Sequence, residues 1–208
     1  MMKRSSIFGL TLVAFAFSSM ALPAQAATVV ANTVIEFFDS GNGSQPGPYG
    51  GTFDDSPKPV PLSFATDGNA NTFVSLPTGS FITLGFAGAQ IFNGAGDDIF
   101  ISELGNGAED ASVFVSSDFG STFTFLGTAF GNTTTGLDLN DIPGFTGFIN
   151  AVKVVGLDNG GSSPGFDLAF IQGLEGSVNL VPVPAALPLL VTGLIGLGLI
   201  GRRRKSIA

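Results

Sequence analysis

The chain has 208 residues and a formal net charge of −8, and it contains neither cysteine nor histidine. These two absences exclude disulfides, zinc–thiolate sites, and catalysis by Ser-His-Asp or Cys-His groups. All sixteen acidic residues lie between Glu36 and Glu175, opposed there only by Lys58 and Lys153, so this region has a net charge of −14, which disfavours nucleic acid and suits divalent cations.

The first 26 residues have the pattern of a secretory signal peptide. Residues 1–4 carry two positive charges, and residues 7–20 are apolar and uncharged. Ala24 and Ala26 then place small residues at the two positions that a signal peptidase reads, so we expect cleavage after Ala26. Residues 27–176 are enough for one domain with its own core.

The middle of the chain predicts short β-strands separated by turns rich in Gly, Asn, Asp, Ser and Pro. Several segments alternate apolar and polar residues, as at Val113 and Val115, which indicates a sheet with one buried face. The expected strands cover residues 33–38, 73–76, 81–86, 99–104, 112–116, 122–127, 148–157 and 166–174. This spacing predicts an all-β fold, an antiparallel β-sandwich of jelly-roll type, with the phenylalanines in its core.

Three segments resemble the galactose-binding-like, discoidin-type β-sandwich family: "FATDGNANTFVSLPTGSFITLGF", "VFVSSDFGSTFTFLG" and "AVKVVGLDNGGSSPGFDLAFIQGLEG". The resemblance covers residues 64–176 and implies a structural Ca²⁺ held by Asp67, Asn69, Thr72 and Glu175. The chain departs from the family pattern because Phe73 follows Thr72 directly. The alternative is an ordinary Asx turn, since Asp, Gly and Asn form turns without a metal.

A second acidic loop is "NGAGDDIFI", residues 93–101, which matches a single calcium-binding nonapeptide repeat except for Asn93 at the first Gly. Such repeats bind calcium when stacked, so one copy favours a Gly-rich loop that leads into a strand. Asp97 and Asp98 remain weaker metal candidates, with help from Asp167.

Three pairs of carboxylates raise the question of a glycosidase, which needs two carboxyl groups about 5–10 Å apart. The pairs are Asp54 with Asp55, Asp97 with Asp98, and Glu109 with Asp110. Neighbouring residues on a strand point to opposite faces, and the chain has no Trp, so we interpret these pairs as solvated loop charge.

The C-terminus has the pattern of a membrane anchor. Residues 177–184 are expected to form a linker and sorting motif, and residues 185–201 a transmembrane helix, since about 20 residues span a bilayer core. The basic residues behind this helix stop transfer and hold the last residues, 202–208, in the cytoplasm; they are Arg202, Arg203, Arg204 and Lys205.

The order of motif, apolar helix and basic cluster resembles the PEP-CTERM class of sorting signals, in its VPLPA variant. The matching motif consists of Val181, Pro182, Val183, Pro184 and Ala185. Val183 stands where the variant has Leu. The resemblance implies recognition by an exosortase-type protease of a Gram-negative bacterium and cleavage near the motif; the alternative is a plain anchor without processing.

Together these features predict a non-enzymatic exported protein with a structural or adhesive role in exopolysaccharide or biofilm. The protein is expected to be a membrane-anchored intermediate that later reaches the cell surface or extracellular matrix. Its expected partners are the sorting protease, extracellular polysaccharide and the inner membrane, but no nucleic acid. One alternative is a carbohydrate-binding module with a defined glycan, and another is a carboxylate-based hydrolase.

Overall fold

The computed structural model describes residues 28–53, 57–105, 107, 109–160, 163–174 and 178–180, the last three by their backbone alone. The predicted signal peptide with Ala24 and Ala26, Glu175, the sorting motif at residues 181–185, the C-terminal helix and the basic cluster at residues 202–205 lie outside these ranges. Within the described ranges, no helix has both the length and the apolar character needed to cross a membrane.

The larger sheet has seven strands, which are hydrogen-bonded in the order β11-β8-β14-β5-β3-β4, while β1 pairs with β14. Every pairing in it is antiparallel. The strands are β1 (Val29–Val30), β3 (Tyr49–Thr52), β4 (Lys58–Pro59), β5 (Thr72–Leu76), β8 (Ile99–Glu103), β11 (Thr134–Leu137) and β14 (Phe166–Gly173).

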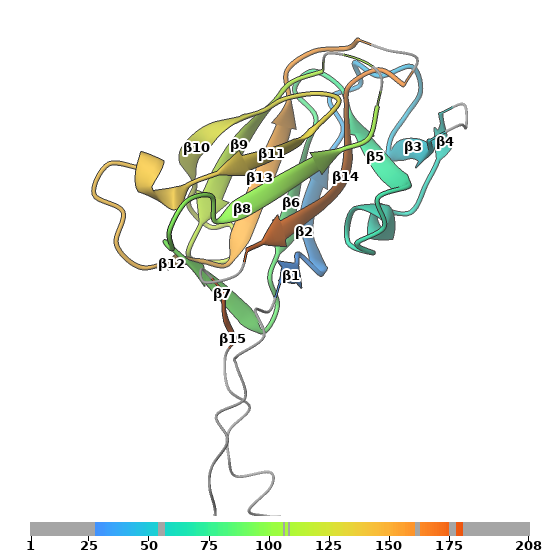
Figure 1. Cartoon of the computed structure of the whole chain (residues 1–208). Helices are drawn as coiled ribbons and strands as arrows, with labels where there is room; N and C mark the ends of the chain where they lie inside the picture. The colour runs from blue at the N-terminus through green and yellow to red at the C-terminus, as the bar shows by residue number, and fades with distance from the viewer. Residues whose placement is uncertain are drawn as a thin grey trace, which may run out of the picture.

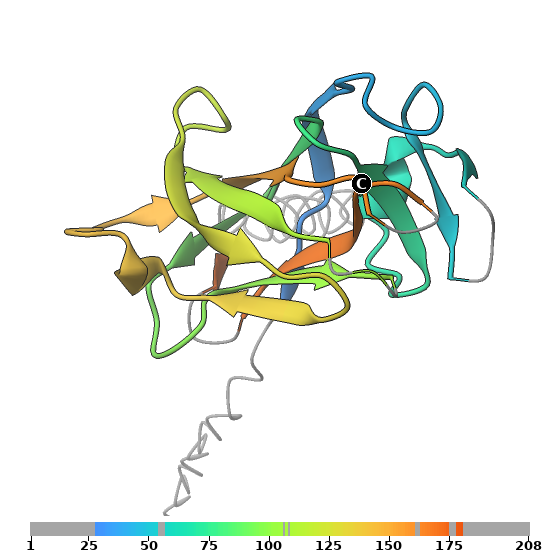
Figure 2. The same cartoon turned by 90° about the horizontal axis from the view of Figure 1, so that it is seen from above.

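A second antiparallel sheet of five strands has the order β10-β9-β13-β6-β2, and it forms the other layer of the molecule (Figures 1 and 2). Its strands are β2 (Thr33–Phe38), β6 (Phe81–Gly85), β9 (Ala111–Ser116), β10 (Thr124–Ala129) and β13 (Ala151–Gly156). A small third sheet joins β12 (Phe148–Ile149), β7 (Ala89–Phe92) and β15 (Val178–Leu180). Two 3₁₀ helices, η1 (Leu62–Ala65) and η2 (Leu139–Asp141), lie in the connections.

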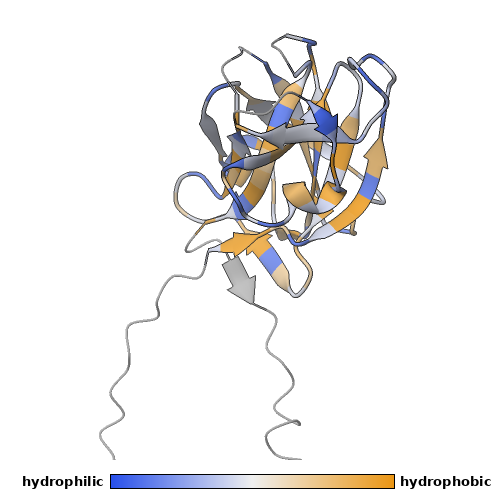
Figure 3. Ribbon diagram, turned by 90° about the vertical axis from the view of Figure 1, so that its right-hand side faces the viewer, coloured by the Kyte–Doolittle hydropathy of each residue, from blue (hydrophilic) through white to orange (hydrophobic). Residues whose placement is uncertain are grey.

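The core lies between the two large sheets. Val152 and Val154 on β13 are fully buried, whereas Lys153 between them is only partly buried, which is the alternation expected of a strand with one face inward. Leu168 and Ile171 on β14 belong to the same hydrophobic cluster from the opposite sheet. Figure 3 shows apolar and polar residues following one another along the strands. The all-β, antiparallel class predicted from the sequence is confirmed.

The expected strand at residues 148–157 is in fact two strands, β12 and β13, which separate at the buried Asn150. The Asn150 side chain donates a hydrogen bond to the Ser117 carbonyl and accepts one from the Phe119 N–H, so this residue ties the chain to a neighbouring loop. Strand β15 lies within the segment predicted to be a linker, where its backbone pairs with β7.

Candidate functional site

The loop that the family resemblance proposes for calcium forms an Asx-type turn. Asp67 Oδ1 accepts a hydrogen bond from the Asn69 N–H at 2.8 Å, and the Thr72 hydroxyl donates to Asp67 Oδ2 at 3.0 Å. Asn69 Oδ1 in turn accepts from the Asn71 N–H. The loop thus brings Asp67, Asn69 and Thr72 together, while the fourth predicted ligand lies outside the described residues. Calcium in this loop stays a prediction.

The weaker metal candidates are placed in different surroundings. Asp97 is exposed, whereas Asp98 is buried and accepts hydrogen bonds from the N–H groups of Gly94 and Leu139 at 2.7 and 2.9 Å. Burial raises the pKa of Asp98, although these two bonds act in the opposite direction. Asp167 is also buried, but it clusters with Glu103 and Glu109.

The interpretation of the acidic pairs as solvated loop charge is wrong for Asp98 and Glu109, because both side chains are buried. Sequence reasoning also missed Glu103 as a candidate ligand. The sequence did contain a signal for Glu103. Side chains two residues apart on a strand point to the same face, and Ile99 and Ile101 on β8 face the core, so Glu103 should face it too. A carboxylate at an inward position of a strand needs a partner.

A groove of about 450 Å³ opens between the end of β9, the start of β10 and the loop that leads into β12. Its volume is in the range of small-molecule sites. One wall comes from β9, β10 and their connection: Val115, Ser116, Ser117, Thr122 and Thr124. The other wall is the continuous segment 142–149.

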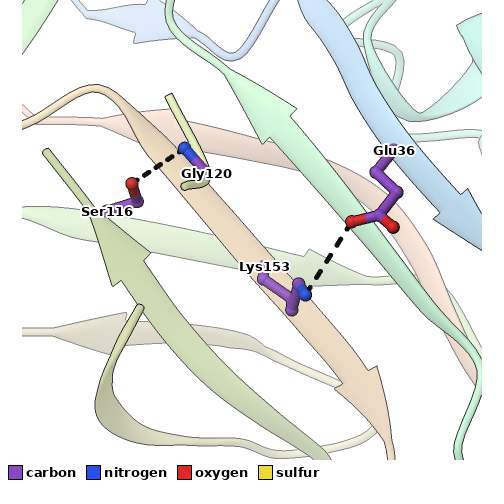
Figure 4. A network of polar contacts seen from close by, with 4 residues as sticks. All are labelled: Glu36, Ser116, Gly120 and Lys153. Atoms are coloured by element: carbon purple, nitrogen blue, oxygen red, sulfur yellow. Dashed lines mark hydrogen bonds and ion pairs between the residues drawn. The ribbon is translucent and has the colours of Figure 1, made fainter. Parts of the chain in front are cut away.

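A set of side-chain hydrogen bonds shapes the first wall. The Ser116 hydroxyl donates to Asp118 Oδ1 at 2.7 Å and accepts from the Gly120 N–H at 2.8 Å (Figure 4). Asp118 also accepts from the N–H and hydroxyl of Thr122. The hydrogen bond from Ser116, followed by those from Thr122, lowers the pKa of Asp118 to about 2. Phe119 and Gly120 both have positive φ, which turns the chain back toward β10.

The second wall combines two phenylalanines with glycine turns. Phe145 packs against the core, and the Phe148 ring lies 5.8 Å from the ring of Phe92. Gly144 and Gly147 have positive φ, and a Cβ at either position would meet no atom within 4 Å, so both turns border open space. This wall therefore presents backbone groups beside apolar rings.

The groove is chemically neutral. None of the groove-lining residues is ionisable, in the part of the chain that the structure describes. The hydroxyls of Ser117, Thr124 and Thr146 make no hydrogen bond with the described residues and can meet a ligand. Ser116 is occupied by its own turn, and a serine nucleophile would need a base that this groove does not offer. The arrangement suits binding of a polar, uncharged molecule.

The prediction that the phenylalanines are core residues is wrong for several of them. Their side chains are about half exposed, from 49% to 54%, at Phe38, Phe53, Phe119, Phe125 and Phe130. On the outer face of the five-stranded sheet, the Lys153 ammonium lies 4.1 Å from the centre of the Phe81 ring and 3.9 Å from Glu36 Oε2 (Figure 4). Part of the aromatic content therefore lies on the surface.

Among known proteins, the chain is similar to several solved structures. No protein-family model matches the chain, and no curated protein matches it. The chain is similar to the CBM32 of AlyQ in complex with 4,5-unsaturated mannuronic acid, with 12% identity, a TM-score of 0.42, and coverage of 68% of this chain and 95% of that one. It is similar to the C-terminal domain of a chitobiase from Bacteroides fragilis, with 16% identity, a TM-score of 0.44, and coverage of 71% and 94%. It is also similar to the family 32 CBM from C. perfringens NanJ in complex with galactose, with 16% identity, a TM-score of 0.42, and coverage of 72% and 100%.

Proposed function

We propose that this protein is a non-catalytic glycan-binding module and that a neutral saccharide binds in the groove between β9, β10 and residues 142–149. The observation that carries the proposal is the composition of the groove. Hydroxyls of Ser117, Thr124 and Thr146 can exchange hydrogen bonds with a polyol, and the rings of Phe145 and Phe148 offer apolar surface to the C–H faces of a sugar.

A neutral ligand fits better than an acidic one. The region between Glu36 and Glu175 has a net charge of −14, so its field repels anions. Asp118 and Asp141 flank the two walls of the groove, and both are exposed. A uronate placed there would meet like charge on both sides.

A binding role fits better than a hydrolytic one. Hydrolysis of a glycoside needs two carboxyl groups that flank the scissile bond. Two carboxylates, Asp118 and Asp141, do flank the groove, but hydrogen bonds from Ser116 and Thr122 hold Asp118 in its own turn and lower its pKa to about 2, which is unsuited to a general acid. The clustered carboxylates of Glu103, Glu109 and Asp167 are buried and do not line the groove. The inventory of the groove thus supports recognition without bond cleavage.

The two ends of the sequence support a location outside the cytoplasm. We infer from the signal-peptide pattern and from the motif at Val181–Ala185 that the protein is exported, held by its C-terminal helix, and then processed by an exosortase-type protease. A glycan-binding domain delivered in this way would bind exopolysaccharide at the cell surface or in the matrix.

A glycan array tests the proposed function. The purified protein is incubated with an array of neutral and uronate-containing oligosaccharides. The sugars that bind, and any fragments released into the supernatant, are identified by mass spectrometry. We expect retention of one class of neutral saccharides without shortening of their chains. Binding restricted to acidic sugars, or release of cleaved products, would contradict the proposal.

A further inference from the structure

Three carboxylates from different segments meet at one end of the sandwich. Glu103 is the last residue of β8, Asp167 is the second residue of β14, and Glu109 lies just before β9. One carboxylate oxygen from each lies within 4.8 Å of the others. The first two residues belong to the seven-stranded sheet, while Glu109 leads into the five-stranded sheet. The cluster therefore stands where the two layers are joined by residues 104–110.

All three side chains are withdrawn from solvent. Their exposed fractions are 7% for Glu103, 2% for Glu109 and 5% for Asp167. Glu103 Oε1 and Glu109 Oε1 are fully buried and have no hydrogen-bond partner among the described residues. A buried carboxylate oxygen without a partner is costly, because it has lost its hydration and has gained no hydrogen bond in exchange.

The hydrogen bonds that the structure does supply are few. Glu103 Oε2 accepts from the Asn132 N–H, and Asp167 Oδ1 accepts from the Ser75 hydroxyl, which also bonds to the Ser163 hydroxyl at 2.6 Å. Lys153 does not neutralise the cluster, because its ammonium group binds Glu36 on the outer face of the other sheet.

Glycines allow the chain to close around the unpartnered oxygens. A Cβ at Gly105 would lie 2.5 Å from Glu103 Oε1, and a Cβ at Gly107 would lie 3.2 Å from Glu109 Oε1. A Cβ at Gly160 would lie 3.3 Å from Glu109 Cγ. At Gly105, Gly107 and Gly160 the backbone therefore approaches the two glutamate side chains more closely than most side chains would permit.

We propose that Glu103, Glu109 and Asp167 bind a divalent cation, with Ca²⁺ as the expected ion. Calcium takes six to eight oxygen ligands at about 2.3–2.6 Å, so two oxygens on the same ion are at most about 5 Å apart, and the spacing of the cluster satisfies this limit. The ligand set consists of oxygens alone, which suits a hard cation. The bound ion would clamp the end of β8, the start of β14 and the entry to β9.

The acid–base behaviour of the cluster agrees with this assignment. Burial raises the pKa of Glu103 to about 7, that of Glu109 to about 8 and that of Asp167 to about 9. Mutual repulsion of the carboxylates adds to the shifts of Glu109 and Asp167. A cation supplies the positive charge that would let all three groups ionise at neutral pH.

This site differs from the turn that contains Asp67, Asn69 and Thr72. Asp67 is exposed and already satisfied by hydrogen bonds from its own turn, whereas the three clustered carboxylates are buried and incompletely paired. The two sites can therefore be separated by mutation.

Thermal unfolding and titration calorimetry test the proposal. The purified protein is measured in EDTA and then with CaCl₂ or MgCl₂, beside D167N, E109Q and E103Q. At a hundredfold excess over its Kd, Ca²⁺ is expected to raise the Tm of the unmodified protein by about 5–10 °C. The three variants should lose most of this rise and one equivalent of bound Ca²⁺. In EDTA they should melt no lower than the unmodified protein, since each amide keeps a hydrogen-bond acceptor and removes a carboxyl group that is costly to ionise when buried.

Two further variants serve as controls. D141N removes one exposed charge and should leave the response intact, and D67A reports on the other loop. The proposal is wrong if Ca²⁺ has no effect, if it shifts the unmodified protein and D167N equally, or if D67A alone abolishes the response. Lower melting of all three cluster variants in EDTA would also overturn it, because the carboxyl groups would then stabilise the fold without a metal. This experiment does not measure glycan binding, so a failure of the metal-site proposal would not contradict the proposed function of the groove.

Discussion

The Ser116 hydroxyl accepts a hydrogen bond from the Gly120 backbone N–H at 2.8 Å. This contact bends residues 117–119 into the turn that forms one wall of the groove. Ser116 is itself buried and lies at the end of β9, so the position of the wall is fixed by a residue of the sheet. Ligand binding in the groove should therefore depend on the Ser116 hydroxyl even if this group does not contact the ligand.

Replacing this hydroxyl tests that dependence. S116A removes one donor and one acceptor, so the Gly120 N–H loses its partner and the Asp118 carboxylate keeps its hydrogen bonds from Thr122 but loses the one from Ser116. We expect a loss of about 1–2 kcal/mol in the free energy of unfolding, a fall in Tm of about 2–8 °C, and weaker glycan binding. S121A is the control, because among the described residues the Ser121 hydroxyl bonds to the Asp118 carbonyl alone. Equal effects of the two variants, measured by thermal unfolding and binding, would contradict this role for Ser116.

The stability that the same turn confers should decrease in acid, because it depends on the ionised carboxylate of Asp118. Its pKa is lowered to about 2 by the hydrogen bonds from Ser116 and Thr122, so its contribution to stability is complete above the ordinary pKa near 4. That contribution is lost as the pH falls through about 2. The Tm difference between the unmodified protein and D118N should shrink between pH 4 and pH 2. A difference that stays constant down to pH 2 would show that the carboxylate is not held in this way.

The buried carboxyl groups of Glu103, Glu109 and Asp167 should give the opposite pH dependence of stability in metal-free protein. Their pKa values are raised to about 7, 8 and 9, so the stability linked to their protonation is complete below about pH 4. It is lost as the pH rises through the range from 7 to 9. In EDTA, the Tm is therefore expected to fall between pH 5 and pH 9. The fall should be smaller in D167N, and a Tm that rises over this interval would contradict the shifts.

The C-terminal segment predicts a processed product. The sorting motif precedes the apolar helix, so cleavage near it would remove the basic cluster at residues 202–205. Intact-mass measurement of protein extracted from the cell envelope is expected to find a main species without these residues. A main species that extends to Ala208 would contradict sorting by cleavage and leave a plain anchor.

The strands that alternate most clearly were the easiest to predict. The predicted strand at residues 112–116 begins one residue after the start of β9 and ends with it, and its Val113 and Val115 are buried in the core. Strands such as β3, with the sequence YGGT, and β11, with TTGL, carry no such alternation, and only pairing with their neighbours defines them. Local pattern therefore predicts strands whose own side chains build the core.

The groove and the carboxylate cluster could not be predicted in the same way. The groove joins residues 115–124 to residues 142–149, and these meet because β9 pairs with β13 in one register. The cluster joins Glu103 to Asp167 across the β8–β14 pair, with Glu109 added from a loop. Such contacts depend on strand order, which the sequence pattern of a single strand does not contain. The inward parity of Glu103 was the one local signal.

Isothermal titration of a neutral saccharide selected on the array tests the groove most directly. T124V removes a hydroxyl from the groove, and F148A removes a ring. The matched controls are T128V on the same strand as Thr124 and F53A, just after the end of β3. We predict that T124V weakens binding about three- to tenfold and F148A about tenfold, while both controls bind as the unmodified protein does. Equal affinity in all five proteins would contradict binding in this groove.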